Sequence, residues 1–271
     1  EDLSLSWQSS LDGEFSTAGA DTSGALSLST SDLQPGEHAL EIRVTDTDGL
    51  YAVDQRTLHV NAVPTAPTVS ISPDPAVTTD DLVATATGAT DPDASGAVTL
   101  AYAWTEDGAA LSETSATLPA ASTTKGRTYR VSVTPSDDMG AGEAGTAELE
   151  VSNADPSLTG PSLSASTAQV GDTLICAATA SDVDPADSPT VSMAWHDGST
   201  GPTYTVVEGD DPGDTLSCTA RADDGDGGTA SGTATATVSN TDPSISAASV
   251  TPTSARVGDT LTCAATATDA D

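Results

Sequence analysis

Aromatic and basic residues are both scarce in this chain of 271 residues. Aromatics make up 3% of it, as one Phe, four Tyr and three Trp, and seven Lys and Arg stand against 41 Asp and Glu. The net charge of −34 excludes ordinary nucleic-acid binding and repels anionic lipid. No run approaches the roughly 18 apolar residues that a membrane-spanning helix requires. We therefore expect no nucleic-acid partner and no membrane insertion in this segment.

Cysteine and histidine are also rare, with three of each, and no Cys-x-x-Cys occurs, so a zinc site is not expected. His38, His59 and His196 are scattered in or beside predicted strands, and the sequence therefore predicts no Ser-His-Asp constellation. Catalysis also needs a concave pocket, which small β units without long insertions do not offer. We expect a protein that is not an enzyme and that requires no cofactor.

What the chain does contain is a repeat. Val170-Gly-Asp-Thr-Leu-Ile-Cys176 recurs as Val257-Gly-Asp-Thr-Leu-Thr-Cys263, an offset of 257 − 170 = 87 residues. This is the length of one small all-β domain, and a fixed period indicates a tandem array. Period-two alternation in runs such as residues 40–44 and 129–133 is typical of half-buried strands. The predicted fold class is all-β, with tandem immunoglobulin-like (Ig-like) antiparallel β-sandwiches arranged as an extended rod.

Three tryptophans, Trp7, Trp104 and Trp195, supply the register, because each ends an alternating apolar run and is followed within six residues by Asp-Gly. One large ring per unit can fill a sandwich whose other inward residues are small. Exposed aromatics could instead stack on carbohydrate. Each Trp alternates with apolar residues and so shares their buried face, which favours core anchors.

These anchors divide the chain into four parts. Residues 63–152 and 153–239 are expected to be complete Ig-like domains. Residues 1–62 are expected to be the C-terminal part of such a domain, with its first two strands missing, and residues 240–271 the N-terminal part of one. Two interpretations of these complementary parts remain open: strands from one copy complete the next in a head-to-tail filament, or the chain is cut from a longer series of repeats.

The cysteines supply a second check on the fold. Cys176 and Cys218 bracket Trp195, which is the order found in an immunoglobulin-type sandwich with a disulfide between its sheets. Such a bridge would stabilise the unit by roughly 3 to 4 kcal/mol on the chain-entropy account. It predicts an oxidising, extracellular or cell-surface location. Cys263 repeats the place of Cys176, and either its partner lies in sequence not shown or it is a free thiol.

Residues 33–49, Leu-Gln-Pro-Gly-Glu-His-Ala-Leu-Glu-Ile-Arg-Val-Thr-Asp-Thr-Asp-Gly, carry a family resemblance. They are similar to the strand and turn Gly-x-Tyr-x-Val-x-Leu-x-Val-x-Asp-x-x-Gly of bacterial and archaeal Ig-like repeats of the polycystic-kidney-disease (PKD) type or their cadherin-like relatives. His38 stands where that family has an aromatic residue. The resemblance implies a β-sandwich used as a stalk, spacer or adhesive module on secreted and cell-surface proteins, without catalytic residues.

Aspartates concentrate in the turn after the second strand of each unit and in the turn before its last strand. Both turns are expected at the end where the chain enters from the previous unit, so oxygen-rich segments would converge there. Such a junction suits Ca²⁺, which takes six to eight oxygen ligands. Asp and Gly are also simply good turn residues, which is the plainer interpretation. The predicted ligands are Asp155, Asp182, Asp184, Asp223, Asp224, Asp242, Asp269 and Asp271.

The sequence therefore predicts a structural repeat segment of an extracellular or cell-surface fibre, stalk or filament. Its expected partners are adjacent repeats or further copies of the chain, head to tail. The alternative is an adhesin-type module that recognises a glycan or protein through its loops. Tyr51 and Tyr204 are the loop aromatics that would favour this alternative.

Overall fold

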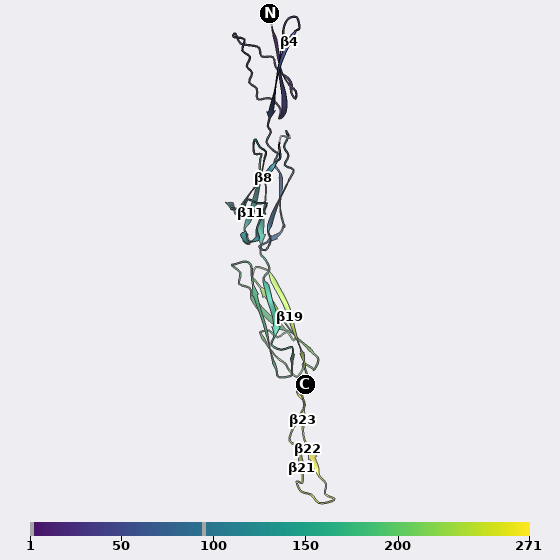
Figure 1. The fold of residues 1–271 in the computed structure, drawn as a ribbon. Helices are drawn as coiled ribbons and strands as arrows, with labels where there is room; N and C mark the ends of the chain where they lie inside the picture. The colour runs from purple at the N-terminus through teal and green to yellow at the C-terminus, as the bar shows by residue number, and fades with distance from the viewer. Residues whose placement is uncertain (1–2, 94–95) are drawn as a thin grey trace. The chain divides into compact units, whose positions relative to one another are not determined.

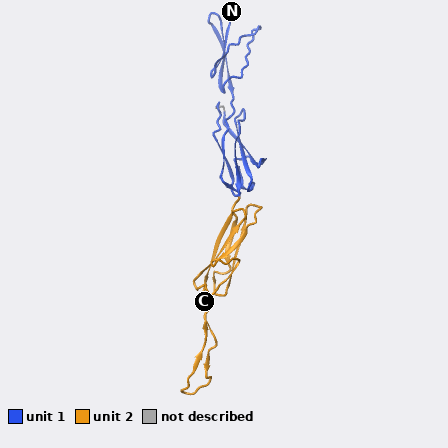
Figure 2. Cartoon of the chain, turned by 180° about the vertical axis from the view of Figure 1, so that it is seen from behind, with its two compact units in different colours: residues 1–152 blue, residues 153–271 orange. Residues whose placement is uncertain are grey.

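The computed structural model describes residues 3–93 and 96–271. The regular structure of these residues consists of β-strands and one short 3₁₀ helix, Ala120–Ser122 (Figure 1). The sheets are antiparallel apart from two short parallel pairings, which confirms the predicted all-β class. No described helix has the length and apolar character needed to cross a membrane. The chain divides into two compact units, residues 1–152 and 153–271 (Figure 2). The further boundaries at 62/63 and 239/240 stay a prediction.

The first part of unit 1 is a single sheet of four strands in the order β2-β1-β3-β4. Its strands are β1 (Ser4–Ser9), β2 (Gly13–Ser16), β3 (Gly36–Thr45) and β4 (Tyr51–Val60). Trp7 on β1 lies opposite Ile42 on β3. Both are only half-buried, because no second sheet of the described residues covers this face. We call this sheet the N-terminal sheet.

The rest of unit 1 is a two-layer structure, which we call the first sandwich. One layer is β10-β7-β5 and the other is β6-β12-β11-β8-β9. Its core lies between them and includes Trp104, Tyr129, Val131 and Leu82, all at most 1% exposed. The strands are β5 (Thr68–Ser72), β6 (Ala76–Val77), β7 (Leu82–Thr87), β8 (Thr99–Glu106), β9 (Ala109–Ala110), β10 (Thr117–Leu118), β11 (Thr128–Ser136) and β12 (Gly145–Ser152).

Unit 2 begins with the second sandwich, in which β13-β15-β17 faces β14-β19-β18-β16. A disulfide joins Cys176 on β15 to Cys218 on β18 and so links the two layers. Trp195 lies opposite Cys218 in the sheet and is buried. The strands are β13 (Ser157–Leu163), β14 (Thr167–Ala168), β15 (Thr173–Ser181), β16 (Thr190–Trp195), β17 (Thr203–Thr205), β18 (Thr215–Asp223) and β19 (Thr229–Val238).

In the first sandwich, Ala84 and Val131 are buried at the positions where the second sandwich has its two cysteines. The two layers of the first sandwich are therefore joined there by aliphatic packing and not by a disulfide. Cys263 is exposed and unbridged.

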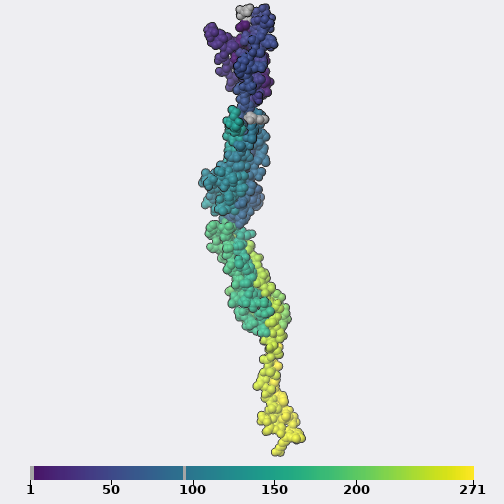
Figure 3. All heavy atoms as spheres, viewed as in Figure 1, coloured from purple at the N-terminus to yellow at the C-terminus, as the bar shows by residue number. Residues whose placement is uncertain are grey.

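The last part of unit 2 consists of two short strand pairs, β20 (Ser244–Ile245) with β23 (Ala267–Thr268) and β21 (Ser249–Thr251) with β22 (Thr262–Ala264). Every residue of these strands is exposed. Figure 3 shows them, in yellow, as a thin segment of the space-filling surface. We call residues 244–268 the C-terminal ladder.

Candidate metal site

The turn that follows β3, β11 and β18 begins the same way in each sheet. Asp46, Asp137 and Asp224 each stand one residue beyond the last paired residue of the strand that lies beside the Trp strand, and each accepts bonds from its own turn. Asp224 Oδ1 accepts from the N–H groups of Asp226 and Gly228, at 2.8 and 3.0 Å. Desolvation opposes ionisation of Asp137, but its bonds from the Met139 and Gly140 N–H groups hold its pKa below the ordinary value.

Linker residues at the start of each sandwich are hydrogen-bonded to carboxylates of both acidic turns. In the second sandwich, Asn153 Nδ2 donates to Asp224 Oδ2 at 2.7 Å, and the Ala154 N–H donates to Asp184 Oδ2 at 3.1 Å. The first sandwich repeats both bonds, from Asn61 Nδ2 to Asp137 and from the Ala62 N–H to Asp93.

A third linker repeats the second of these bonds. The Thr241 N–H donates to Asp271 Oδ2 at 3.0 Å, which lowers the pKa of Asp271. We call the pair of bonds, from the Asn side chain and from the next N–H, the linker clasp. The clasp shows that the acidic turns hold the entering chain.

Three carboxylates converge beside the clasp of the second sandwich. Oxygen atoms of Asp182, Asp187 and Asp224 all lie within 4.8 Å of one another. Asp182 Oδ1 accepts from the Asp184 N–H, whereas Asp182 Oδ2 is buried and has no hydrogen-bond partner. Crowded carboxylates repel one another, and a cation relieves that repulsion. This oxygen-only donor set with one unpaired buried oxygen fits Ca²⁺.

Only some of the predicted ligands of the second sandwich lie in the cluster. Asp182 and Asp224 are in the cluster, while Asp184 is 2% exposed and holds the linker. Asp155 accepts from the Thr229 N–H at 3.3 Å. Asp223 is not in the cluster, and its Oδ2 accepts from Arg221 at 2.6 Å.

The remaining predicted ligands lie in the last part of the chain, where Asp242 and Asp269 are exposed and Asp271 holds Thr241. One buried oxygen of Asp271, Oδ1, has no hydrogen-bond partner. The predicted set omitted Asp187, although it is the third aspartate of the run Asp182-Val-Asp-Pro-Ala-Asp187, a signal that was available in the sequence.

In the first sandwich, glycine and aspartate are swapped at two positions of these acidic turns. The pair Thr99 and Ser136 corresponds to the pair Thr190 and Asp223 of the second sandwich. Counting from these pairs, Gly96 corresponds to Asp187. In the same way, Asp138 corresponds to Gly225. Asp138 Oδ1 lies 3.4 Å from the place that a Cβ on Gly96 would take. The carboxylate of Asp138 therefore lies next to the position that corresponds to Asp187 in the other sandwich.

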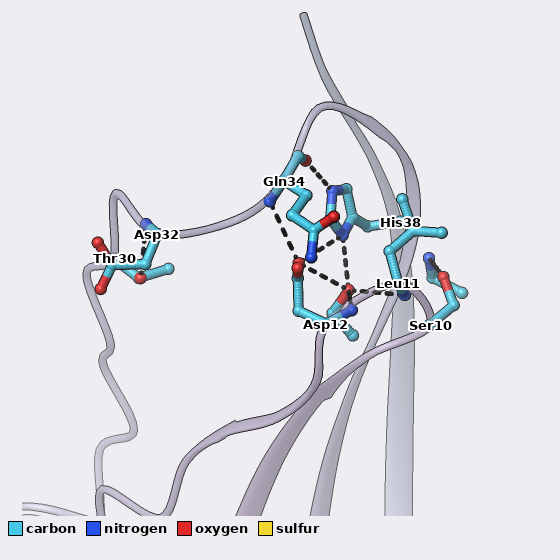
Figure 4. Close-up of polar contacts among 9 residues, drawn as sticks. Ser10, Leu11, Asp12, Thr30, Asp32, Gln34 and His38 are labelled. Atoms are coloured by element: carbon cyan, nitrogen blue, oxygen red, sulfur yellow. Dashed lines mark hydrogen bonds and ion pairs between the residues drawn. The ribbon is translucent and has the colours of Figure 1, made fainter. Parts of the chain in front are cut away.

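A polar cluster around the buried His38 in the N-terminal sheet also includes Ser9 and Asp12, and the sequence analysis did not predict it. Figure 4 shows His38 and Asp12 in this cluster. His38 Nε2 donates to the Gln34 carbonyl at 2.6 Å, and Ser9 Oγ lies 2.6 Å from the other ring nitrogen, Nδ1. Asp12 approaches the same nitrogen, at 3.4 Å. A catalytic triad needs the serine and the aspartate on opposite ring nitrogens. His38 is wholly buried, and the cluster holds together the turn at Asp12 and the chain at Gln34, just before β3.

A second polar cluster corrects the expectation for Tyr204. Its side chain is buried and stacks on Trp195, with ring centroids 5.2 Å apart, and its hydroxyl donates to Asp210 Oδ2 at 2.8 Å. Burial and the Asp210 carboxylate raise the pKa of Tyr204 well above its ordinary value. His196 is also drawn in, with Nε2 3.2 Å from Asp210 Oδ1. The prediction that Tyr204 is an exposed loop aromatic is therefore wrong. Tyr51, the other predicted loop aromatic, is 61% exposed.

No protein-family model matches the chain, and no curated protein matches it. Solved structures similar to it include three N-terminal domains of the highly immunogenic outer capsid protein of bacteriophage RB49, at 14% identity and TM-score 0.33 over 88% of each chain. A Ca²⁺-stabilised adhesin of an Antarctic bacterium has 16% identity and TM-score 0.32, over 93% of this chain and 69% of that one. Extracellular cadherin domains 3–6 of protocadherin gamma B2 have 11% identity and TM-score 0.27, over 94% and 69%. Because these TM-scores lie below 0.5, the fold class rests on the sheets described above.

Proposed function

We propose that the chain is a structural repeat segment of an extracellular or cell-surface fibre, stalk or filament, and that it carries no catalytic function. The observation that carries this proposal is the linker clasp. An Asn side chain and the next backbone N–H are bonded to acidic turns at residues 61–62 and again at 153–154. A clasp repeated at the start of successive sandwiches fixes the entering residues to each sandwich, which supports a role as a series of similar structural units.

Ca²⁺ would strengthen this role. Asp182, Asp187 and Asp224 would hold the ion, with Asp182 Oδ2 as the buried oxygen that lacks another partner. A bound Ca²⁺ supplies positive charge and up to eight coordination positions to a site in which the protein provides only oxygen. Asp184 and Asn153 would keep the linker against the site through the bonds they already make. The disulfide supports a location outside the cell.

Chelation tests the proposal. At a calcium concentration ten times a millimolar-range dissociation constant, binding adds about 1.4 kcal/mol to the free energy of unfolding. We expect calorimetry to show a second-sandwich melting temperature several degrees higher in calcium than in chelator. Small-angle scattering should show a narrower distribution of interatomic distances with calcium, because the linkers are held.

Matched variants identify the site. Asp187→Asn removes a cluster carboxylate and should abolish the calcium-dependent shift, whereas Asp223→Asn removes an equal charge from a side chain paired with Arg221 and should leave it. Magnesium at the same ionic strength controls for screening. A melting temperature and a scattering profile that do not respond to calcium would contradict the proposal.

A second candidate function is recognition of a glycan or protein through the loops. Tyr51 favours it, because this exposed ring lies at the start of β4 with the Arg43 guanidinium 3.7 Å from its centroid. Stacked aromatic and guanidinium groups are common in binding surfaces. One aromatic residue gives this candidate less support than the repeated clasp gives the structural one.

A further inference from the structure

The linker clasp of the first sandwich includes a contact with a histidine. His59 lies near the end of β4, shortly before Asn61, and its Nε2 is 3.2 Å from Asp93 Oδ1. The other oxygen of this carboxylate, Asp93 Oδ2, accepts from the Ala62 N–H and so forms half of the clasp. One carboxylate therefore contacts both the last strand of the N-terminal sheet and the linker that follows it.

The strand register shows which residues take the place of this histidine at the other linkers. In each sheet, a row of paired residues runs from the Trp strand to the last strand, where it reaches Asp54, Ala147 and Ala234. Five residues further along these last strands are His59, Ser152 and Ser239. Histidine is the side chain whose charge ordinarily changes between about pH 5 and 8, whereas serine stays neutral. Of these three positions, only the first can therefore respond to a proton.

The two contacting atoms are shielded from solvent, although the imidazole itself is not. The Asp93 side chain is 0% exposed, and the His59 side chain is 31% exposed with its Nε2 atom buried. The ring can thus exchange a proton with solvent, while the contact lies where charges are screened weakly. Protonation of His59 converts this contact into an ion pair with a buried carboxylate.

The charged groups that neighbouring elements bring to this imidazole are acidic in the described residues. They are Glu37, paired with His59 on β3, Asp91 and Asp93 in the turn after β7, and Asp137 and Asp138 in the turn after β11. Asp137 also accepts from the Asn61 amide, and the charge of Asp93 acts on it. Nearby carboxylates favour the protonated ring. The contact therefore stabilises the joint at low pH, and this stabilisation is lost as the pH rises and the ring loses its proton.

We propose that the first linker clasp is a pH-dependent device. Protonated His59 pairs with Asp93 and fixes the N-terminal sheet to the first sandwich, and loss of the proton weakens this attachment. The clasp of the second sandwich has Ser152 at the corresponding place and should not respond. The device goes beyond the proposed calcium site, because it lies in the other sandwich and needs only a proton.

Amide hydrogen exchange of the full chain in chelator tests the device, because the Ala62 N–H reports on the clasp. His59→Ser gives the first clasp the residue of the second. At about pH 5.5, the Ala62 amide should exchange at least about threefold faster in this variant than in the unchanged chain, since one ion pair is lost. At about pH 8 the two rates should agree. Comparing both proteins at the same pH removes the intrinsic pH dependence of exchange.

The chain supplies two controls. The Ala154 amide makes the same bond, to Asp184, at the clasp that has a serine. Its exchange should be the same in both proteins at each pH. His196→Ser removes a histidine from unit 2 and should leave the exchange of Ala62 unchanged.

Equal acceleration at both pH values would mean that His59 only packs against the clasp, and no acceleration at the lower pH would mean that the pair does not form. Either result would overturn the inference. An NMR titration of the unchanged chain needs no substitution, and the Ala62 N–H and His59 imidazole signals should shift with one common midpoint. An Ala62 signal that does not follow the imidazole would also overturn it. None of these results bears on the calcium response of the second sandwich, which Asp187→Asn tests separately.

Discussion

At the scale of single residues, a few buried polar groups decide the local structure of a chain with a thin core. Asp210 is 7% exposed and accepts from the Tyr204 hydroxyl and from the Val207 N–H, at 2.8 and 2.9 Å. Desolvation opposes its ionisation, but these bonds and the approach of His196 lower the pKa of Asp210. Through Tyr204, this carboxylate also fixes the ring that stacks on Trp195.

We predict that Asp210→Asn lowers the stability of the second sandwich by about 1–3 kcal/mol at pH 7, since it weakens bonds to buried donors. The folded pKa lies below the ordinary 3.8, so the stabilisation is present above that value and is lost as pH falls through the folded pKa. Urea unfolding should show the difference from the unchanged chain shrinking below about pH 4. Asp211→Asn, an exposed neighbour, is the control for charge alone. A difference that does not depend on pH would contradict this account.

At the scale of strands, the two sandwiches share a close crossing of their layers. Gly145, at the start of β12, lies against the Pro67 carbonyl, and a Cβ there would overlap that oxygen. Gly232 holds the matching place on β19, where a Cβ would stand 2.8 Å from Pro161 Cδ and 3.0 Å from the Gly160 oxygen. Glycine is needed here for the approach of the layers. Layers of small residues can pack this closely only where one backbone presents no side chain.

We predict that Gly145→Ala destabilises the first sandwich by roughly 1–3 kcal/mol, because the added methyl group forces β12 away from the opposite layer. Gly209→Ala is the control, since a Cβ at Gly209 would meet nothing within 4 Å. That variant should stay within about 0.5 kcal/mol of the unchanged chain. Denaturant unfolding measures both. Equal effects of the two substitutions would argue that the crossing does not matter.

At the scale of the whole molecule, the net charge of −34 acts on every part of the chain. Seven basic residues compensate few of these charges, and the ion pairs of Arg56, Arg127 and Arg221 with aspartates are exposed. Exposed pairs contribute at most about 1 kcal/mol each. Self-repulsion therefore opposes the compact state, and dissolved salt screens it.

We predict that raising sodium chloride from about 10 to 500 mM raises the melting temperature by several degrees, as the Debye length falls from roughly 30 Å to well below 10 Å. Potassium chloride should have the same effect, because screening depends on ionic strength and not on the identity of the ion. Calorimetry in chelator separates this effect from calcium binding. A flat salt response would show that repulsion does not limit stability.

The sequence alone was enough for much of the fold. Period-two alternation indicated strands such as β3 and β11, since alternation reports directly on which face of a strand is buried. The 87-residue repeat and the order Cys176, Trp195, Cys218 indicated two sheets joined by a disulfide, which the structure has. Part of the candidate metal site was also accessible, because Asp182 and Asp224 lie in turns whose positions follow from the strands.

Other features could not be predicted because they depend on loops that meet only in the fold. Asp187 joins the cluster while Asp223 turns to Arg221, although both lie in equally acidic runs. The buried His38 ring is bonded to Ser9 and to Gln34, and the buried Tyr204 hydroxyl is bonded to Asp210.

Strand pattern, repeat length and the spacing of Trp and Cys were thus determined by the sequence itself, because each is set by local alternation along the backbone. Which carboxylates converge, and which apolar faces remain uncovered, was decided only by the tertiary structure, because side-chain direction in a turn and burial of a sheet face depend on contacts between distant segments.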